Sequence, residues 1–175
     1  MKPLFHSEQG ASAVEFALVL PILVFLTFAI IEFGILLFDK AVITNASREG
    51  ARNAIVFNAN ADGSPNYLTE SDIKKIVIDY TKGNSADKGI LINLGNPSKT
   101  VLNIDDVTIS CSPNPSAESW PSGACTNKGY YLNVQVNYTY NFLVLPNLAR
   151  LLQGDFNDVN LTLPLHSKTV MRMEG

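Results

Sequence analysis

Residues 16–38 read FALVLPILVFLTFAIIEFGILLF, and this stretch decides the fold of the chain. Seventeen of its 23 residues are Leu, Ile, Val or Phe. At about 1.5 Å of rise per residue, a helix of this length spans about 34 Å, enough to cross the hydrocarbon core of a membrane. Glu32 opposes insertion by less than about 3 kcal/mol because it lies off-centre, whereas the apolar side chains contribute about 5–10 kcal/mol in favour. The stretch therefore predicts one transmembrane helix.

A cleavable secretory signal is the alternative interpretation of this stretch. Such a signal has an apolar region of roughly 7–15 residues, followed closely by a small-x-small cleavage site. Here the apolar run is longer, and the Ala-x-Ala at residues 11–13 precedes it. The basic residues do not settle the orientation. By themselves they favour a C-terminus on the cytoplasmic side, because Lys2 precedes the span while Lys40, Arg48 and Arg52 follow it.

The helix is expected to continue beyond the membrane. Residues 39–56 contain no proline and carry four alanines, and Glu49 stands three residues before Arg52, a spacing that allows an ion pair on one helix face. Gly50 is the weak point, at a cost of about 1 kcal/mol relative to alanine. We expect one continuous helix over residues 11–56, about 68 Å long, with half in lipid and half projecting as a stalk.

A second helix is expected after a turn-rich segment at residues 57–68 that ends the first one. It covers residues 69–82, begins at a cap formed by Ser71 or Thr69, and ends at Gly83. Its apolar face consists of Ile73, Ile76, Val77 and Tyr80.

The remaining chain predicts β-strands at residues 107–111, 130–141 and 161–165, the last with an extension over 167–173 past Pro164. The middle strand alternates most regularly. Its apolar positions need a cover, which we expect from the helix over 39–56 or from the apolar face of the second helix. These positions are Leu132, Val134, Val136, Tyr138 and Tyr140. A long N-terminal helix packed on a small antiparallel sheet is an α+β fold.

Cys111 and Cys125 flank a loop that is rich in Pro, Ser, Asn and Gly. Two cysteines that close a polar loop predict a disulfide, which forms in an oxidising compartment outside the cytoplasm. The alternative is two unrelated free thiols.

The composition gives no sign of catalysis, a cofactor or nucleic-acid binding. The net charge is −3, and no basic residues cluster as a nucleic-acid interface requires. His6 lies near the N-terminus and His166 adjoins a predicted core strand, so neither is placed to activate a nucleophile. Asp105 and Asp106 could contact a cation, but such a pair more often ends a strand in water. We therefore expect no enzymatic activity, no metal and no cofactor.

Residues 10–16 read GASAVEF and lie between a short polar leader and the apolar run. Gly10 offers no side chain to a protease subsite and allows an extended backbone. Glu15 stands five residues later, near a helix N-terminus, where the helix dipole favours a carboxylate. The dipole alone explains Glu15. It does not explain the combination of leader, glycine, acidic residue, Phe16 and apolar helix.

This combination resembles the prepilin peptidase site of the type IV pilin superfamily, and the chain most resembles the TadE-like pseudopilins of the tight-adherence pilus. Three parts carry the resemblance: residues 10–34, which include Pro21 and Glu32; ITNASREGARNAIV at 43–56; and the C-terminal stretches 134–152 and 163–175. The family more often has Tyr where Phe16 stands. Residues 57–129 match no pattern of the family.

The resemblance implies a pilin-like fold with three parts. Residues 1–10 would be a prepilin leader, residues 11–56 the N-terminal helix with its transmembrane span at 16–38, and residues 57–175 an extracytoplasmic α+β domain. A prepilin peptidase would cut between Gly10 and Ala11. Assembly would then use Glu15, Phe16 and Glu32 to pair this helix with others.

The resemblance also implies a role as a minor pilin or pseudopilin in pilus assembly. The protein would sit in the bacterial inner membrane with its domain outside the cytoplasm, or enter the fibre. Its partners would be the peptidase, other pilin and pseudopilin subunits and the assembly platform. The alternative is a signal-anchored periplasmic binding or scaffold domain unrelated to pili, in which Gly10 stays uncleaved.

Overall fold

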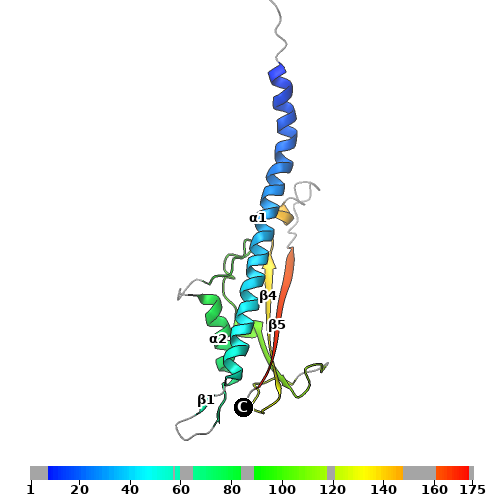
Figure 1. Ribbon diagram of the computed structural model, residues 1–175. Helices are drawn as coiled ribbons and strands as arrows, with labels where there is room; N and C mark the ends of the chain where they lie inside the picture. Colours follow the sequence, from blue (N-terminus) through cyan, green and yellow to red (C-terminus); the bar gives the residue numbers. More distant parts are fainter. Residues whose placement is uncertain are drawn as a thin grey trace, which may run out of the picture.

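The computed structural model describes residues 8–56, 58–59, 65–83, 89–117, 121–147 and 161–173. Of the predicted leader, it describes the last three residues. A long helix and a three-stranded antiparallel sheet of order β3-β4-β5 confirm the α+β fold (Figure 1). The elements are α1 (Glu8–Ile55), β1 (Asn58–Ala59), β2 (Pro65–Asn66), α2 (Glu70–Lys82), the 3-10 helix η1 (Ile104–Asp106), β3 (Val107–Ser112), β4 (Tyr131–Asn141) and β5 (Thr162–Arg172).

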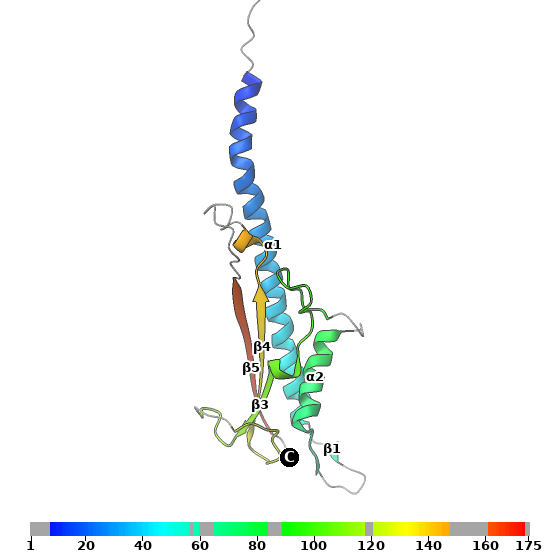
Figure 2. The same cartoon turned by 180° about the vertical axis from the view of Figure 1, so that it is seen from behind.

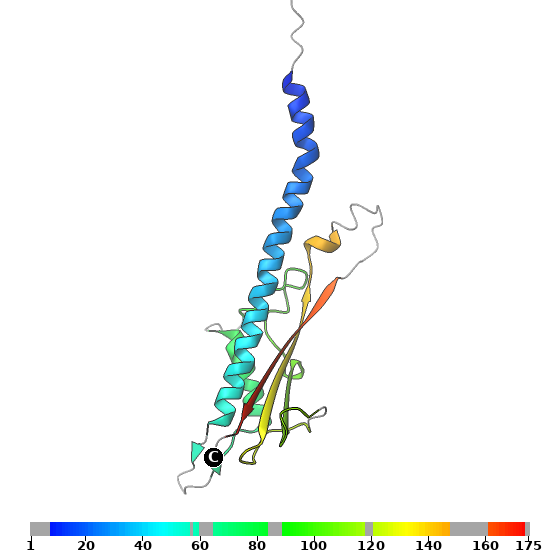
Figure 3. The same ribbon diagram turned by 45° about the vertical axis from the view of Figure 1, so that its right-hand side comes forward.

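α1 is a single helix of 48 residues, which confirms the predicted continuous helix. At 1.5 Å per residue it is about 72 Å long. Pro21 lies inside it and removes one backbone hydrogen bond without ending the helix. The N-terminal part of α1 stands clear of the sheet, whereas the C-terminal part lies along it (Figure 3).

The C-terminal part of α1 is the central element of the core, and it supplies the cover that we expected from residues 39–56. One side of the helix is buried at intervals of three or four residues, which keeps these residues on one face. The sheet and α2 pack on that face. It consists of Glu32, Leu36, Asp39, Ile43, Ala46, Gly50 and Ala54.

The apolar face of β4 packs as predicted. All five of its apolar side chains are buried, in one cluster with residues of α1 and α2. Both expected covers contribute, because α1 contacts β4 and β5 while α2 contacts α1 and β3. From behind, α2 lies beside the end of α1 that is far from the uncovered helix (Figure 2).

α2 begins and ends at its predicted signals. The Thr69 hydroxyl accepts a hydrogen bond from the N–H of Asp72, and the Asp72 carboxylate accepts one from the N–H of Thr69. This reciprocal pair is a capping box, which satisfies amides that the first turn leaves free. Gly83 ends the helix with φ of 60°, a backbone conformation that glycine adopts without steric cost.

The predicted apolar face of α2 is partly wrong. Ile73 and Val77 are buried, but Tyr80 is 38% exposed and Thr81 is buried instead. The contact follows residues spaced four apart, which lie in a row along one side of the helix. Gly50 of α1 faces this row, and a Cβ on it would lie 2.4 Å from Val77 Cγ2. The glycine that weakens α1 locally is thus what lets α2 approach.

Pro164 lies inside β5, and the strand continues past it as predicted. Just beyond the ladder, the N–H of Phe142 donates to the carbonyl of Leu161. Hydrogen-bonded pairs alternate with non-bonded pairs in an antiparallel ladder, so Thr139 and Pro164, three positions away, form a non-bonded pair. The backbone nitrogen of Pro164 therefore faces away from β4, so its lack of an N–H costs the ladder no hydrogen bond.

Polar side chains tie β5 to α1. Lys40 Nζ donates to the carbonyl oxygen of His166. Ser47 Oγ lies 2.9 Å from Ser167 Oγ and 2.7 Å from Thr169 Oγ1. The position of His166 beside a predicted core strand suggested a buried ring. The ring is instead exposed on the outer face of the sheet.

The predicted disulfide is confirmed. Cys111 and Cys125 are bonded, with their Cα atoms 5.3 Å apart. The loop that they close returns along β3, where the N–H of Cys111 donates to the carbonyl of Pro121 and the N–H of Gly123 donates to that of Ile109. The disulfide thus fixes this loop against the outer edge of β3, where it covers backbone groups of the strand. Loop-closure entropy for a bridge of this span is worth about 3 kcal/mol.

Candidate functional site: the N-terminal helix and its junction with the domain

The residues predicted for cleavage and assembly lie in the first turns of α1. Gly10, Ala11, Glu15 and Phe16 are all exposed. The helix begins at Glu8, so the backbone at Gly10 is helical. Side chains that face outward on this helix are free to meet another molecule. Their roles in cleavage and helix pairing stay predictions.

α1 could cross a membrane once. It contains a window of 18 residues with a mean hydropathy of 2.6 that is 0% buried. Over residues 10–31, Phe25 and Ala29 are half-covered and the others are exposed. This uncovered part begins and ends earlier than the span predicted at 16–38, because the domain packs on the helix from Glu32 onward.

Glu32 has its partners within the chain. Its side chain is 1% exposed. Its Oε1 accepts hydrogen bonds from the N–H groups of Leu143 and Val144, and its Oε2 lies 3.2 Å from the N–H of Val144. Residues 144–147 form a helical turn, so Glu32 caps the amides that open it. The structure thus shows Glu32 joining α1 to the domain, and its predicted pairing with other helices stays untested.

Asp39 is a second buried carboxyl group on the same face of α1. It is 0% exposed, and its Oδ1 accepts a hydrogen bond of 2.9 Å from the N–H of Ile92. Its Oδ2 has no hydrogen-bond partner among the described residues. Burial raises the pKa of Asp39 to about 6, although the N–H of Ile92 opposes the shift. Burial first, and then the carboxyl groups of Glu32 and Asp39, raise the pKa of Tyr140 to about 12.

We expect Asp39→Asn to change how the stability of the protein depends on pH. The pKa of Asp39 rises from 3.8 to about 6 on folding, so the folded state holds this proton more tightly than the unfolded chain. Wild-type stability should therefore fall as the pH rises from about 4 to about 6, by at most about 3 kcal/mol. Asparagine keeps an oxygen for the N–H of Ile92 but cannot ionise, so the variant should lack this fall.

Thermal unfolding of both proteins in detergent, measured from about pH 4 to about pH 8, checks this expectation. The variant should match the wild type in acid and exceed it in stability at neutral pH. A difference between the two proteins that is the same at every pH would contradict it.

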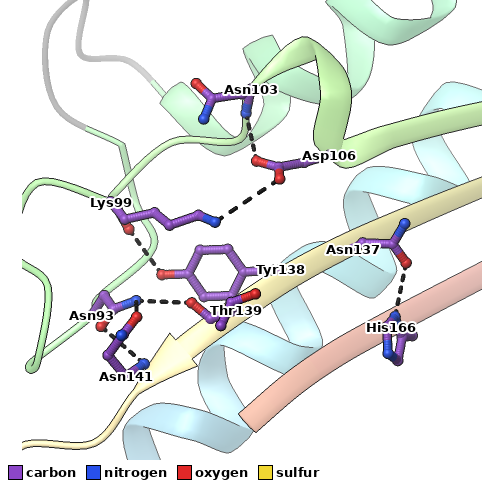
Figure 4. Close-up of polar contacts among 9 residues, drawn as sticks. All are labelled: Asn93, Lys99, Asn103, Asp106, Asn137, Tyr138, Thr139, Asn141 and His166. Carbon is purple, nitrogen blue, oxygen red and sulfur yellow. Dashed lines mark hydrogen bonds and ion pairs between the residues drawn. The ribbon is translucent and has the colours of Figure 1, made fainter. Parts of the chain in front are cut away.

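The segment between α2 and β3 closes the part of β4 that β3 does not reach. β3 pairs with β4 up to Val136, which leaves residues 137–141 without a partner strand on that side. Asn93 Nδ2 donates to the carbonyl of Thr139 at 3.1 Å, and the N–H of Asn141 donates to Asn93 Oδ1 at 3.1 Å (Figure 4). The N–H of Gly95 donates to the carbonyl of Asn141 at 3.0 Å. Asn93 thus takes the place of a neighbouring strand.

Asp105 and Asp106, the two carboxylates that could contact a cation, lie in the same segment. Asp106 Oδ2 accepts a hydrogen bond from the N–H of Asn103 at 2.8 Å, and its Oδ1 lies 3.9 Å from Lys99 Nζ (Figure 4). The carbonyl of Lys99 accepts a hydrogen bond of 2.9 Å from the Tyr138 hydroxyl. Asp106 therefore holds the segment in place, while Asp105 is exposed. Within the described residues, no three His, Cys, Asp or Glu side chains gather as a metal site.

The comparison with protein families gives one match. The family model described as "TadE-like protein" matches residues 10–52, which include Gly10, Glu15, Glu32 and the REGAR segment at 48–52. This match confirms the family resemblance that the sequence suggested, over the N-terminal helix. No curated protein matches the chain, and no solved structure matches it.

Proposed function

We propose that the protein is a minor pilin or pseudopilin of a tight-adherence pilus. The proposal is based on a TadE-like N-terminal helix that carries a pilin-like α+β domain. The observation that carries the proposal is the family match over residues 10–52, which holds the predicted cleavage site and Glu15 in one helix. A prepilin peptidase would remove residues 1–10. The proposed role is structural, with no catalysis and no cofactor.

The uncovered helix supports an assembly role for Glu15. In lipid a carboxylate is expensive, so a helix that carries one gains by moving it next to a positive charge. Cleavage after Gly10 would create an α-amino group at Ala11, and the Glu15 of a neighbouring subunit could pair with it. The small side chains Ala11, Ser12, Ala13 and Ala17 would let the helices approach closely.

The proposed location is the bacterial inner membrane, with a single span and the domain outside the cytoplasm. The Cys111–Cys125 disulfide supports this orientation, because such bonds persist in oxidising compartments. It outweighs the basic residues after the span, two of which contact other residues of the chain. Lys40 binds the carbonyl of His166, and Arg52 lies 3.9 Å from Glu49. The partners would be other pilin and pseudopilin subunits and the assembly platform.

Glu15→Ala is expected to stop pilus assembly while leaving the protein folded. Glu15 is exposed and lies far along α1 from the domain, so the domain should keep its stability. Removing a charge near the membrane should not hinder insertion. Pilus yield on the cell surface and the amount of protein in the membrane together test this.

Glu70→Ala is the matched control, because Glu70 is a surface residue of α2 that pairs only with Lys74 of its own helix among the contacts described. It should leave both quantities unchanged. Normal assembly by Glu15→Ala would rule out the charge-pairing account. A fall in the amount of protein would mean that Glu15 serves folding.

A further inference from the structure

An apolar groove of about 670 Å³ lies between α1 and the end of the domain nearest the uncovered helix. This size falls within the roughly 300–1,000 Å³ of sites that hold small molecules. α1 lines it from Pro21 to Ile35, and the domain contributes Leu94, Leu143, Val144 and Asn147. Of these lining residues Asn147 alone is polar. The turn at 144–147 follows β4 and lies beside α1 where the helix leaves the sheet (Figure 3).

Part of the groove wall belongs to the part of α1 that is able to cross a membrane. Residues 10–31 make a helix of about 33 Å, which matches a hydrocarbon core of about 30 Å. On this scale Pro21 is near the middle of the membrane and Ile31 at its surface. Phe28 and Ile31 are 51% and 49% exposed, and both line the groove. Lipid that surrounds the membrane span would therefore also reach the groove.

The domain side of the groove has the backbone chemistry that contact with lipid requires. The N–H groups of Leu143 and Val144 are both bound by the buried carboxyl group of Glu32. In water these amides would need no such partner, whereas in lipid an unbound amide costs several kcal/mol. The Leu143 side chain is 45% exposed. Because both amides are hydrogen-bonded and the Leu143 side chain faces outward, this surface is suited to contact with lipid hydrocarbon.

We propose that lipid acyl chains occupy this groove, so that the turn at 143–147 and Leu94 rest in the membrane surface. The domain then lies against the membrane instead of standing off it. The inference rests on the proposed membrane span of the chain. A helix from a second copy has similar chemistry, and the test below distinguishes it.

The test uses full-length protein with its disulfide intact, in vesicles of phosphatidylethanolamine and phosphatidylglycerol that carry brominated acyl chains. A fluorophore is attached to Leu143→Cys, to Ile30→Cys on the exposed span, or to Lys75→Cys on the exposed side of α2. Quenching by bromine at position 143 should be close to that at position 30 and several-fold above that at position 75. Leu94→Cys is the second reporter if Leu143→Cys fails to fold.

Three results would overturn the inference. If aqueous iodide quenches position 143 as strongly as position 75, water fills the groove. If position 143 is shielded from both quenchers in a way that depends on the ratio of protein to lipid, a second copy covers it. If position 30 also escapes bromine, the span is not in lipid, and the proposed membrane location fails as well.

Discussion

Replacement of Glu32 by alanine is expected to lower the free energy of unfolding by about 2–5 kcal/mol. The change leaves the N–H groups of Leu143 and Val144 without their acceptor, at a site where the Glu32 side chain is only 1% exposed. Each buried amide without a partner costs about 1–3 kcal/mol, and the lost side chain also leaves a space. Denaturant unfolding in detergent, followed by the near-ultraviolet signal of the domain, measures the loss.

Two further variants set the scale of this result. Glu32→Gln keeps one acceptor oxygen and nearly the same volume, so its loss should be intermediate. Glu70→Ala removes one partner of an ion pair with Lys74 on the side of α2, and such a pair is worth about 0–1 kcal/mol. If Glu32→Ala were as stable as Glu70→Ala, Glu32 would not hold the domain on α1.

Gly10→Val is expected to leave the full-length precursor in the membrane even when the cognate peptidase is active. A side chain at position 10 would enter a protease subsite that takes none, and valine would restrict the backbone there. The precursor keeps residues 1–10, so it runs as a larger species. Its share of the membrane-bound protein, measured by immunoblot and intact mass, should rise from a trace to nearly all.

Gly34→Val is the matched control for this variant. Gly34 lies in the same helix, and a Cβ there meets no heavy atom within 4 Å. Valine at position 34 should therefore leave processing unchanged. Complete processing of Gly10→Val would show that Gly10 does not control cleavage.

Local patterns in the sequence were sufficient for most of the fold. Alternation along β4 predicted which side chains face the core, because a strand places successive residues on opposite faces. Thr69 and Gly83 predicted the ends of α2, because caps act within one turn of the helix. The disulfide followed from two cysteines that flank a polar loop.

The contacts that join α1 to the domain could not be predicted in this way. Glu32 meets an amide 111 residues later in the chain, and periodicity does not show such a pairing. One signal was available within α1. Glu32 and Asp39 share a helix face with Ile43, and this spacing marks where the buried face begins. The predicted span at 16–38 extends past Glu32, the residue at which the domain begins to cover the helix.

Packing between helices also escaped the sequence. Gly50 looked like a weakness in α1, yet it is where Val77 of α2 makes its closest approach. Tyr80 was assigned to the core because it fits a helical period, but the docking row runs through Thr81. Helical periodicity alone allows a buried face through Tyr80 or one through Thr81, and the position of α1 decides between the two.

The candidate site was predicted from a motif rather than from geometry. Gly10 and Glu15 are exposed on a helix end, and the groups that would act on them belong to other molecules. The family match over residues 10–52 supports the motif.

The most direct test of the account is the N-terminal residue of the membrane-bound protein in cells with an active prepilin peptidase. Intact mass and N-terminal sequencing both give it. The expected result is a mature chain that begins at Ala11 and has lost residues 1–10. A membrane form that still begins at Met1 would contradict it and favour a signal-anchored domain, and a soluble form that begins beyond Phe38 would contradict it and indicate secretion.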